Sequence, residues 1–422
     1  MKKLLFLSIL SLSMGLTSCI QDDDTPIIIE VGNGNGGGST TDPQDVVINK
    51  TGLITQDETW TKDNIYRLNQ KVVVEAGVTL TIQEGTIIKG SPGTGSLASA
   101  LIVARGGMIN AVGTPSEPII FTSTSDNIQP GQTAGTNLSI NDRGLWGGVL
   151  LLGNAPCSFS GDVEELQIEG IPADDTFGLY GGNDAEDSSG VMQYVSIRHG
   201  GALIGEGNEI NGLTLGGVGT GTILDNIEVV ANVDDGIEFF GGTVNATNLL
   251  VWGQGDDGLD IDQAYSGTID NAVVALGDVS DHAFEIDGPE GSAPGSFLLQ
   301  NATIIGNLNT NNGEYADFRK GATGTVQNIY AYGFKDDSDV ELDADADATT
   351  YNNGTLVFAN WEIVLPEAVT NVENIFVNKA ENVTVTGFGS EATTVSEGSQ
   401  TVGATTSDLS WTYANAVGNL GF

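Results

Sequence analysis

The chain has 422 residues and carries 56 acidic against 14 basic side chains, a formal charge of −42 at pH 7. Such a polyanion excludes nucleic acid and anionic lipid as direct binding partners, and it favours cations or a cationic partner. The 59 glycines and the lack of a sustained helical period before the last ~20 residues indicate a turn-rich β protein.

The N-terminus has the layout of a secretory signal. Lys2 and Lys3 precede an apolar run over residues 4–16 that is too short to span a bilayer, and the run leads through Thr-Ser into Cys19. This arrangement resembles the bacterial lipobox, which implies that residues 1–18 are removed and that acyl chains on Cys19 hold the protein to outer-membrane lipid. The alternative is an ordinary cleaved signal with an incidental cysteine.

The residues after Cys19 bear on where the protein is displayed. The segment 20–24, Ile-Gln-Asp-Asp-Asp, resembles the acidic export signal of Bacteroidota lipoproteins, which implies exposure on the cell surface. A plain acidic tether is the alternative. The Gly-, Ser- and Thr-rich stretch that follows has no periodicity. We therefore expect residues 19–45 to be a flexible tether and residues 46–422 to be one folded domain.

Short strands and turns alternate along that domain. Residues 72–90, 101–114 and 118–123 each show strand and turn signals in quick succession. Further along, strands that open with asparagine recur at steps of 22, 23, 30, 27 and 46 residues, at Asn226, Asn248, Asn271, Asn301, Asn328 and Asn374. A step of ~22–25 residues with occasional insertions predicts the coil of a three-sided parallel β-helix. Stacked asparagines would exchange amide hydrogen bonds from coil to coil.

A second strand repeats with the same period and supports this fold. Its inward column is Leu213, Ile237, Leu259, Phe284, Phe318 and Val340, and the next residue of each strand points outward. The outward column is Thr214, Glu238, Asp260, Glu285, Arg319 and Glu341. Two columns of matching period predict an all-β chain wound into a single right-handed parallel β-helix. We expect an insertion at 157–189 and a terminal helix near 408–417 that caps the last coil.

Acidic residues gather at one place in successive coils. Asp-Asp-Gly occurs at 234–236 and 256–258 and Asp-His at 281–282, each before a strand with an outward acid. Coils stack about 4.8 Å apart, so these charges must be screened, share protons or bind a hard cation such as Ca²⁺. The predicted metal ligands are Asp234, Asp235, Glu238, Asp256, Asp257, Asp260, Asp262, Asp281, Glu285 and Asp287. Alternatively, each short acid only stabilises its own turn.

A catalytic use of the same acids is the alternative to metal binding. Asp235, Asp256 and Asp257 resemble the carboxylate cluster of polygalacturonase-type hydrolases, in which paired acids serve as general acid and base. The Gly-His-Gly and Arg-x-Lys segments of those enzymes have no counterpart further along this chain. Arg319 beside the acids favours a structural salt bridge over a lyase base. Trp252 and Tyr265 are the weak candidates for contact with a sugar.

Residues 50–420 as a whole resemble uncharacterised Bacteroidota surface lipoproteins with a pectate-lyase-like β-helix. The resemblance lies in the opening coils, the Trp-Gly-Gly segment at 146–148 and the Asp-Asp-Gly strands. Some of those proteins carry a transporter label, and a chain without membrane-length apolar runs would at most accompany an outer-membrane transporter. We expect a non-catalytic surface module that binds glycan, metal or a partner protein. The alternative is a polysaccharide-degrading hydrolase or lyase.

Overall fold

The computed structural model describes residues 46–172, 175–203, 210–310 and 312–422. The expected signal peptide (1–18), the anchoring Cys19 and the tether (19–45) lie outside the described residues. Within the described ranges, no helix is both long enough and apolar enough to cross a membrane.

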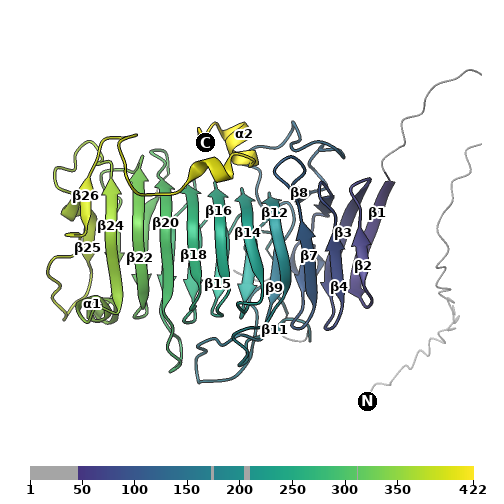
Figure 1. The fold of residues 1–422 in the computed structure, drawn as a ribbon, viewed down its shortest axis with the longest axis horizontal. Helices are drawn as coiled ribbons and strands as arrows, with labels where there is room; N and C mark the ends of the chain where they lie inside the picture. The colour runs from purple at the N-terminus through teal and green to yellow at the C-terminus, as the bar shows by residue number, and fades with distance from the viewer. Residues whose placement is uncertain (1–45, 173–174, 204–209, 311) are drawn as a thin grey trace, which may run out of the picture. The chain divides into compact units, whose positions relative to one another are not determined.

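The described chain winds into successive coils whose strands pair in parallel with the coil before and the coil after (Figure 1). Each coil contributes to three faces, here called sheets I, II and III. Long strands bend at a corner and belong to two faces, so 24 strands form one continuous hydrogen-bonded ladder. The predicted all-β, right-handed parallel β-helix is therefore confirmed.

The strands divide among the three faces as follows. Sheet I holds β2 (Glu58–Trp60), β4 (Thr79–Ile82), β7 (Met108–Val112) and the first halves of β12 (Gly190–Arg198), β14 (Ile223–Val230), β16 (Asn245–Trp252), β18 (Thr268–Ala275), β20 (Phe297–Ile305), β22 (Gly324–Tyr332) and β24 (Leu356–Ile363). Sheet II holds the second halves of these long strands, the first halves of β1 (Val46–Ile54) and β3 (Asn64–Val74), and β5 (Ile87–Gly90), β8 (Ile119–Ser123) and β26 (Ala392–Thr394). Sheet III holds the second halves of β1 and β3 with β6 (Ala100–Val103), β9 (Val149–Leu152), β13 (Leu213–Gly216), β15 (Ile237–Phe240), β17 (Leu259–Asp262), β19 (His282–Asp287), β21 (Glu314–Arg319), β23 (Val340–Leu342) and β25 (Phe376–Asn378).

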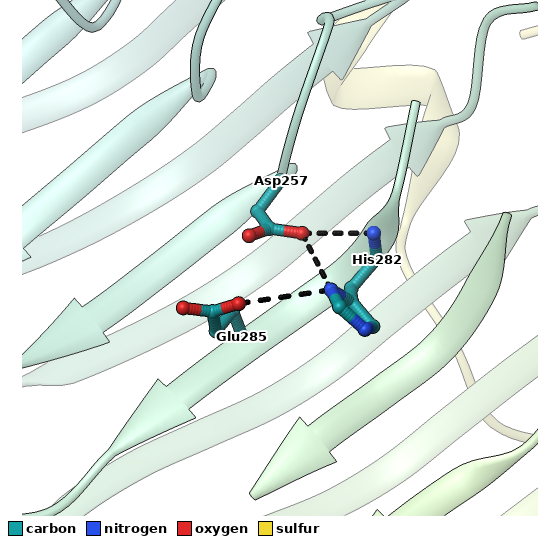
Figure 2. A group of neighbouring side chains, drawn as sticks. All are labelled: Asp257, His282 and Glu285. Atoms are coloured by element: carbon teal, nitrogen blue, oxygen red, sulfur yellow. Dashed lines mark hydrogen bonds and ion pairs between the residues drawn. The ribbon is translucent and has the colours of Figure 1, made fainter. Parts of the chain in front are cut away.

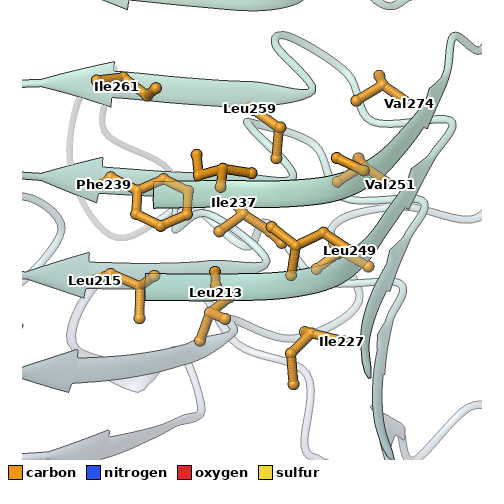
Figure 3. Packing of buried hydrophobic residues seen from close by; sticks show 14 of the residues in the cluster. Leu213, Leu215, Ile227, Ile237, Phe239, Leu249, Val251, Leu259, Ile261 and Val274 are labelled. Atoms are coloured by element: carbon orange, nitrogen blue, oxygen red, sulfur yellow. The ribbon is translucent and has the colours of Figure 1, made fainter. Parts of the chain in front are cut away.

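Inward side chains of the three sheets stack into one continuous core. Leu213, Ile237 and Leu259 lie on consecutive coils of sheet III and face the inward residues of sheet II (Figure 3). Their exposed fractions are 1% or less. Burying each such side chain contributes roughly 1.5–3 kcal/mol to the stability of the fold. The described part of the chain has no disulfide, so packing of the repeated inward side chains stabilises it.

The asparagine ladder forms at the corner between sheets I and II. Its members adopt left-handed backbone angles, with φ between 54° and 62°, a region that asparagine tolerates better than most residues. The amide of Asn271 donates to Asn248 at 2.6 Å and that of Asn328 to Asn301 at 2.9 Å. The predicted last member is wrong, because Asn360 and not Asn374 donates to Asn328. The coil after Asn328 is lengthened by helix α1 (Asp345–Asn352), so a fixed period misses its corner.

The two columns of sheet III are predicted correctly except in β21, where the predicted residues are displaced by two positions; Val340 and Glu341 of β23 lie in the predicted register. In β21, Ala316 faces Phe284 and Asp317 faces Glu285, so they replace the predicted Phe318 and Arg319. Phe318 still points inward, but it stacks between Ile286 and Leu342. A long loop precedes β21, and a two-residue error preserves the in–out alternation that the prediction relied on.

The insertion at 157–189 covers one end of sheet III. It contains the antiparallel hairpin β10 (Leu166–Gln167) and β11 (Leu179–Tyr180). Phe159 and Tyr180 of the insertion pack against the outward side chains Leu150, Leu152 and Phe240. The outward face of sheet III is therefore apolar and covered at β9, and it becomes acidic at Glu238 of β15, the strand whose Phe240 the insertion still contacts.

The C-terminal segment does not cap the last coil, contrary to the prediction. The 3₁₀ helix η3 (Thr406–Leu409) leads into α2 (Tyr413–Gly418), which lies beside β14 and β16 in the middle of the solenoid (Figure 1). Two other short 3₁₀ helices, η1 (Gly95–Leu97) and η2 (Val372–Ile375), occur earlier in the chain. Leu250 and Val273 point outward from sheet II there, and this segment buries them. An apolar patch on the side of the solenoid, and not its open end, has determined where the helix binds.

Candidate functional site

The predicted site residues lie on the outward face of sheet III and in the turns that precede its strands. Five carboxylates occupy the same register position on the consecutive strands β15, β17, β19, β21 and β23, namely Glu238, Asp260, Glu285, Asp317 and Glu341. We call this column, together with the acids of the adjoining turns, the acidic face. Upstream, the column continues as Thr214 and Leu150.

Two of the turn acids join neighbouring coils. The carboxylate of Asp235 accepts a hydrogen bond from the backbone N–H of Asp257 at 2.9 Å. The carboxylate of Asp257 accepts one from the backbone N–H of His282 at 2.8 Å. The turn-stabilising role that was the alternative to metal binding is therefore present at both positions, and it uses one oxygen of each carboxylate.

The acids at the start of the face form the most enclosed group. Oxygens of Asp235, Glu238 and Asp260 lie within 4.8 Å of one another, and the three residues are 7%, 7% and 9% exposed. The amide of Asn211 donates to Glu238, whereas Oδ1 of Asp260 is buried and, among the described residues, has no hydrogen-bond partner. Burial, followed by repulsion from neighbouring carboxylates, raises the pKa of all three well above the ordinary value.

The acids that flank this group are less buried. Asp234, Asp235 and the exposed Asp256 form a second set of oxygens within 4.8 Å of one another. Burial and the neighbouring Asp257 and Asp281 raise the pKa of Asp256 to about 6. Burial also raises the pKa of Asp262 to about 6. Burial is the largest cause of both shifts.

The middle of the face contains a histidine held between two carboxylates (Figure 2). Nδ1 of His282 lies 2.8 Å from Asp257 Oδ1 and 3.7 Å from Glu285 Oε2. Burial lowers the pKa of His282, but the hydrogen bond and the charge of Asp257 outweigh it and raise the pKa to about 9. The ring is thus an imidazolium at neutral pH, which supplies positive charge and cannot ligate a metal without losing its proton.

Basic side chains neutralise the next two predicted ligands. Arg319 pairs with Glu285 and donates from Nε to Asp287 Oδ1 at 2.7 Å, and Nζ of Lys320 lies 2.6 Å from Asp287 Oδ2. The salt bridge expected for Arg319 is present. The middle of the acidic face is therefore internally compensated, whereas among the described residues Asp235, Glu238 and Asp260 form no ion pair with a basic side chain.

Comparison with known protein families matches residues 52–415 to the pectate-lyase-like beta helix domain. The chain belongs to this family. Comparison with curated proteins and with solved structures found no match. Membership in the pectate-lyase-like β-helix family accounts for the coils, and it is compatible with either a binding module or a polysaccharide-degrading enzyme.

The two aromatic residues that were candidates for sugar contact lie away from the acidic face of this pectate-lyase-like β-helix. Tyr265 is 1% exposed, and its hydroxyl donates to the carbonyl oxygen of Val244 at 2.7 Å inside the core. Trp252 is on the outward side of sheet II and packs against Tyr413 of α2. Neither ring is placed where it would stack on a ligand held by the acids.

One group of acids was missed by the sequence reasoning. Glu314, Asp339 and Glu341 bring oxygens within 4.8 Å of one another, beside a cavity of about 320 Å³ that Asp317 also lines. Only Glu341 had been placed in the outward column. Alternation within a strand does not reveal this group, because the turn contact between Glu314 and Asp339 depends on how two long loops close.

Proposed function

We propose that this pectate-lyase-like β-helix is a lipid-anchored cell-surface module that binds Ca²⁺ at Asp235, Glu238 and Asp260 and has a non-catalytic, ligand-binding role. The observation that carries the proposal is the buried Oδ1 of Asp260, which lacks a partner within the described residues and sits among three enclosed carboxylates. An unpaired buried charge is costly unless a cation or a proton compensates it. Ca²⁺ binds carboxylate oxygens at 2.3–2.6 Å, so ligands within 4.8 Å of one another match its size.

The arrangement of the acids also supports binding over catalysis. Arg319 and Lys320 are engaged in ion pairs. With a pKa of about 9, His282 is already protonated at neutral pH and cannot act as a general base on a substrate. Ca²⁺ takes six to eight ligands, and three carboxylates leave positions for water or for an acidic group of a glycan or a partner protein. With the anchor expected at Cys19, that partner would be at the outer membrane, and an outer-membrane transporter is the partner we propose.

Calorimetric titration of chelator-treated protein with Ca²⁺ tests the proposal. We expect binding that Asp260→Asn weakens at least about tenfold, because one ligand loses its charge. The same substitution removes mutual repulsion among the buried carboxylates, so it should raise the melting temperature of the metal-free protein and reduce the further increase that Ca²⁺ produces. Glu367→Gln, at an exposed position outside the face, should change neither property.

Two results would contradict the proposal. The first is a wild-type protein that releases no heat with Ca²⁺ and melts at the same temperature with and without it. The second is product release from a panel of acidic and neutral polysaccharides that Asp257→Asn abolishes, which would establish the hydrolase or lyase alternative at Asp235, Asp256 and Asp257.

A further inference from the structure

A separate group of carboxylates lies at the other end of the acidic face. Glu314 begins β21, Asp339 directly precedes β23, and Glu341 lies within β23 on the adjacent coil. Their oxygens lie within 4.8 Å of one another. The coil of β19 separates this group from Asp235, Glu238 and Asp260. Asp287 of β19 is paired with Arg319 and Lys320.

Two buried carboxylate oxygens without partners belong to residues in or beside this group. Asp317 is 8% exposed, and its Oδ1 has no hydrogen-bond partner in the described part of the chain. Oδ1 of Asp339 is in the same condition. Asp317, Glu314 and Glu341 line a cavity of about 320 Å³, which is large enough for an ion and several waters. The buried, unpartnered carboxylate of Asp317 thus borders a space where a cation fits, and Asp339 belongs to the adjoining group of oxygens.

Two lysines border the cavity, and they differ in how firmly they are held. Nζ of Lys335 donates to the carbonyl oxygen of Thr310 at 2.9 Å. Nζ of Lys379 pairs with Glu341, and the side chain of Lys379 is 49% exposed. The half-exposed ammonium of Lys379 can return to water, whereas the buried carboxylate of Glu341 that it leaves needs another cation to compensate it. The ammonium of Lys379 therefore lies beside Glu341 where a metal ion would bind, and a metal ion could displace it.

We propose that Glu314, Asp339 and Glu341 form a second divalent-cation site, with Asp317 at its border and Lys379 as the side chain that the ion displaces. The oxygens have the spacing that one Ca²⁺ bridges, since its ligands lie at 2.3–2.6 Å. The site extends the proposed cation-binding function to residues that the first site does not use. Either site can therefore fail without the other.

Native mass spectrometry and calorimetry with Ca²⁺ as the only probe test this proposal. Wild-type protein should bind two ions, the double variant Glu314→Gln, Asp339→Asn should lose one of them, and Asp260→Asn should lose the other. Lys379→Met removes the competing ammonium, so it should tighten the second ion about two- to fivefold and leave the first unchanged. Glu367→Gln is the control, and circular dichroism checks that each variant is folded.

The possible failures are distinguishable. A single ion that Asp260→Asn removes, with no effect of Lys379→Met, overturns the second site and supports the first. A single ion that is lost only in the double variant overturns the first site and supports the second. If the double variant does not fold, Lys379→Met decides the matter, because unchanged affinities for both ions would contradict the displacement of Lys379.

Discussion

At the scale of the residue, the corner asparagines are required by both backbone and side chain. Asn328 has φ of 57°, where a residue with a Cβ other than asparagine or aspartate is strained by roughly 1–2 kcal/mol. Its amide also donates to Asn301 and accepts from Asn360, at 2.9 and 3.0 Å. Backbone conformation and hydrogen bonding thus act together to select this residue type.

A pair of substitutions separates these two contributions. Asn328→Gly removes the amide but suits the left-handed backbone, whereas Asn328→Ala removes the amide and adds strain. We expect Asn328→Gly to lower the free energy of unfolding by about 1–2 kcal/mol for the lost hydrogen bonds, and Asn328→Ala to lower it by roughly 1 kcal/mol more. Chemical denaturation of both variants measures the difference. Equal losses would show that backbone strain has no part in the ladder.

At the scale of the element, the C-terminal segment acts as a strap across sheet II. The guanidinium carbon of Arg198 lies 4.3 Å from the centre of the Tyr413 ring. The backbone N–H of Ala414 donates to Glu228 Oε1 at 2.7 Å, and Ser196 donates to Oε2 of the same carboxylate at 2.5 Å. Arg198 and Glu228 are almost completely buried. The strap therefore covers charged groups that would otherwise be exposed on the side of the solenoid.

Removing the aromatic ring of the strap tests this role. Tyr413→Ala should lower the free energy of unfolding by about 3 kcal/mol, because it deletes a buried ring and its contact with Arg198. Hydrogen exchange should then increase in residues 406–418 before it increases in the coils. Tyr413→Phe retains the ring and should behave like the wild type. Loss of stability in Tyr413→Phe as large as that in Tyr413→Ala would count against the packing explanation.

At the scale of the whole molecule, the acidic residues behind the formal charge of −42 do not all titrate alike. Several acids of the acidic face titrate near neutrality, since burial raises the pKa of Asp256 and Asp317 to about 6 and that of Glu314 to about 7. A carboxyl whose pKa is higher in the folded than in the unfolded protein binds its proton more tightly when folded. The stability that this tighter proton binding contributes is complete below pH ~4. It is lost as the pH rises through the pKa of the carboxyl in the folded protein.

The pH dependence of stability should follow these shifts. His282 acts in the same direction, because its pKa of about 9 in the folded protein exceeds the ordinary 6.5, and its contribution is lost as the pH rises through 9. In a chelator, the melting temperature should therefore fall between pH 5 and pH 8. Ca²⁺ binds the deprotonated carboxylates, so its stabilising effect should grow over the same interval. Calorimetric melting curves measure both trends, and a melting temperature that rises from pH 5 to 8 in chelator would contradict this account.

The sequence alone determined the features that repeat locally. The recurring asparagines and the two-residue alternation at Leu213, Ile237 and Leu259 predicted the parallel β-helix, because each coil buries the same face against its neighbour and the period is written into the chain. The gathering of Asp235, Glu238 and Asp260 on adjacent coils was also predicted, since no long insertion interrupts the chain between them.

Only the tertiary structure decided which charges and surfaces meet. The loop before β21 and the segment with helix α1 before β24 carry no signal of the repeat, so the places of Asp317 and Asn360 could not be counted forward from a fixed step. Which acids are neutralised by Arg319 and which remain uncompensated depends on contacts between coils. The strap packs against residues more than 180 positions earlier, as in the contact of Ala414 with Glu228. Local sequence encodes the period of a solenoid, whereas long-range pairing of its outward side chains is settled only when the coils are stacked.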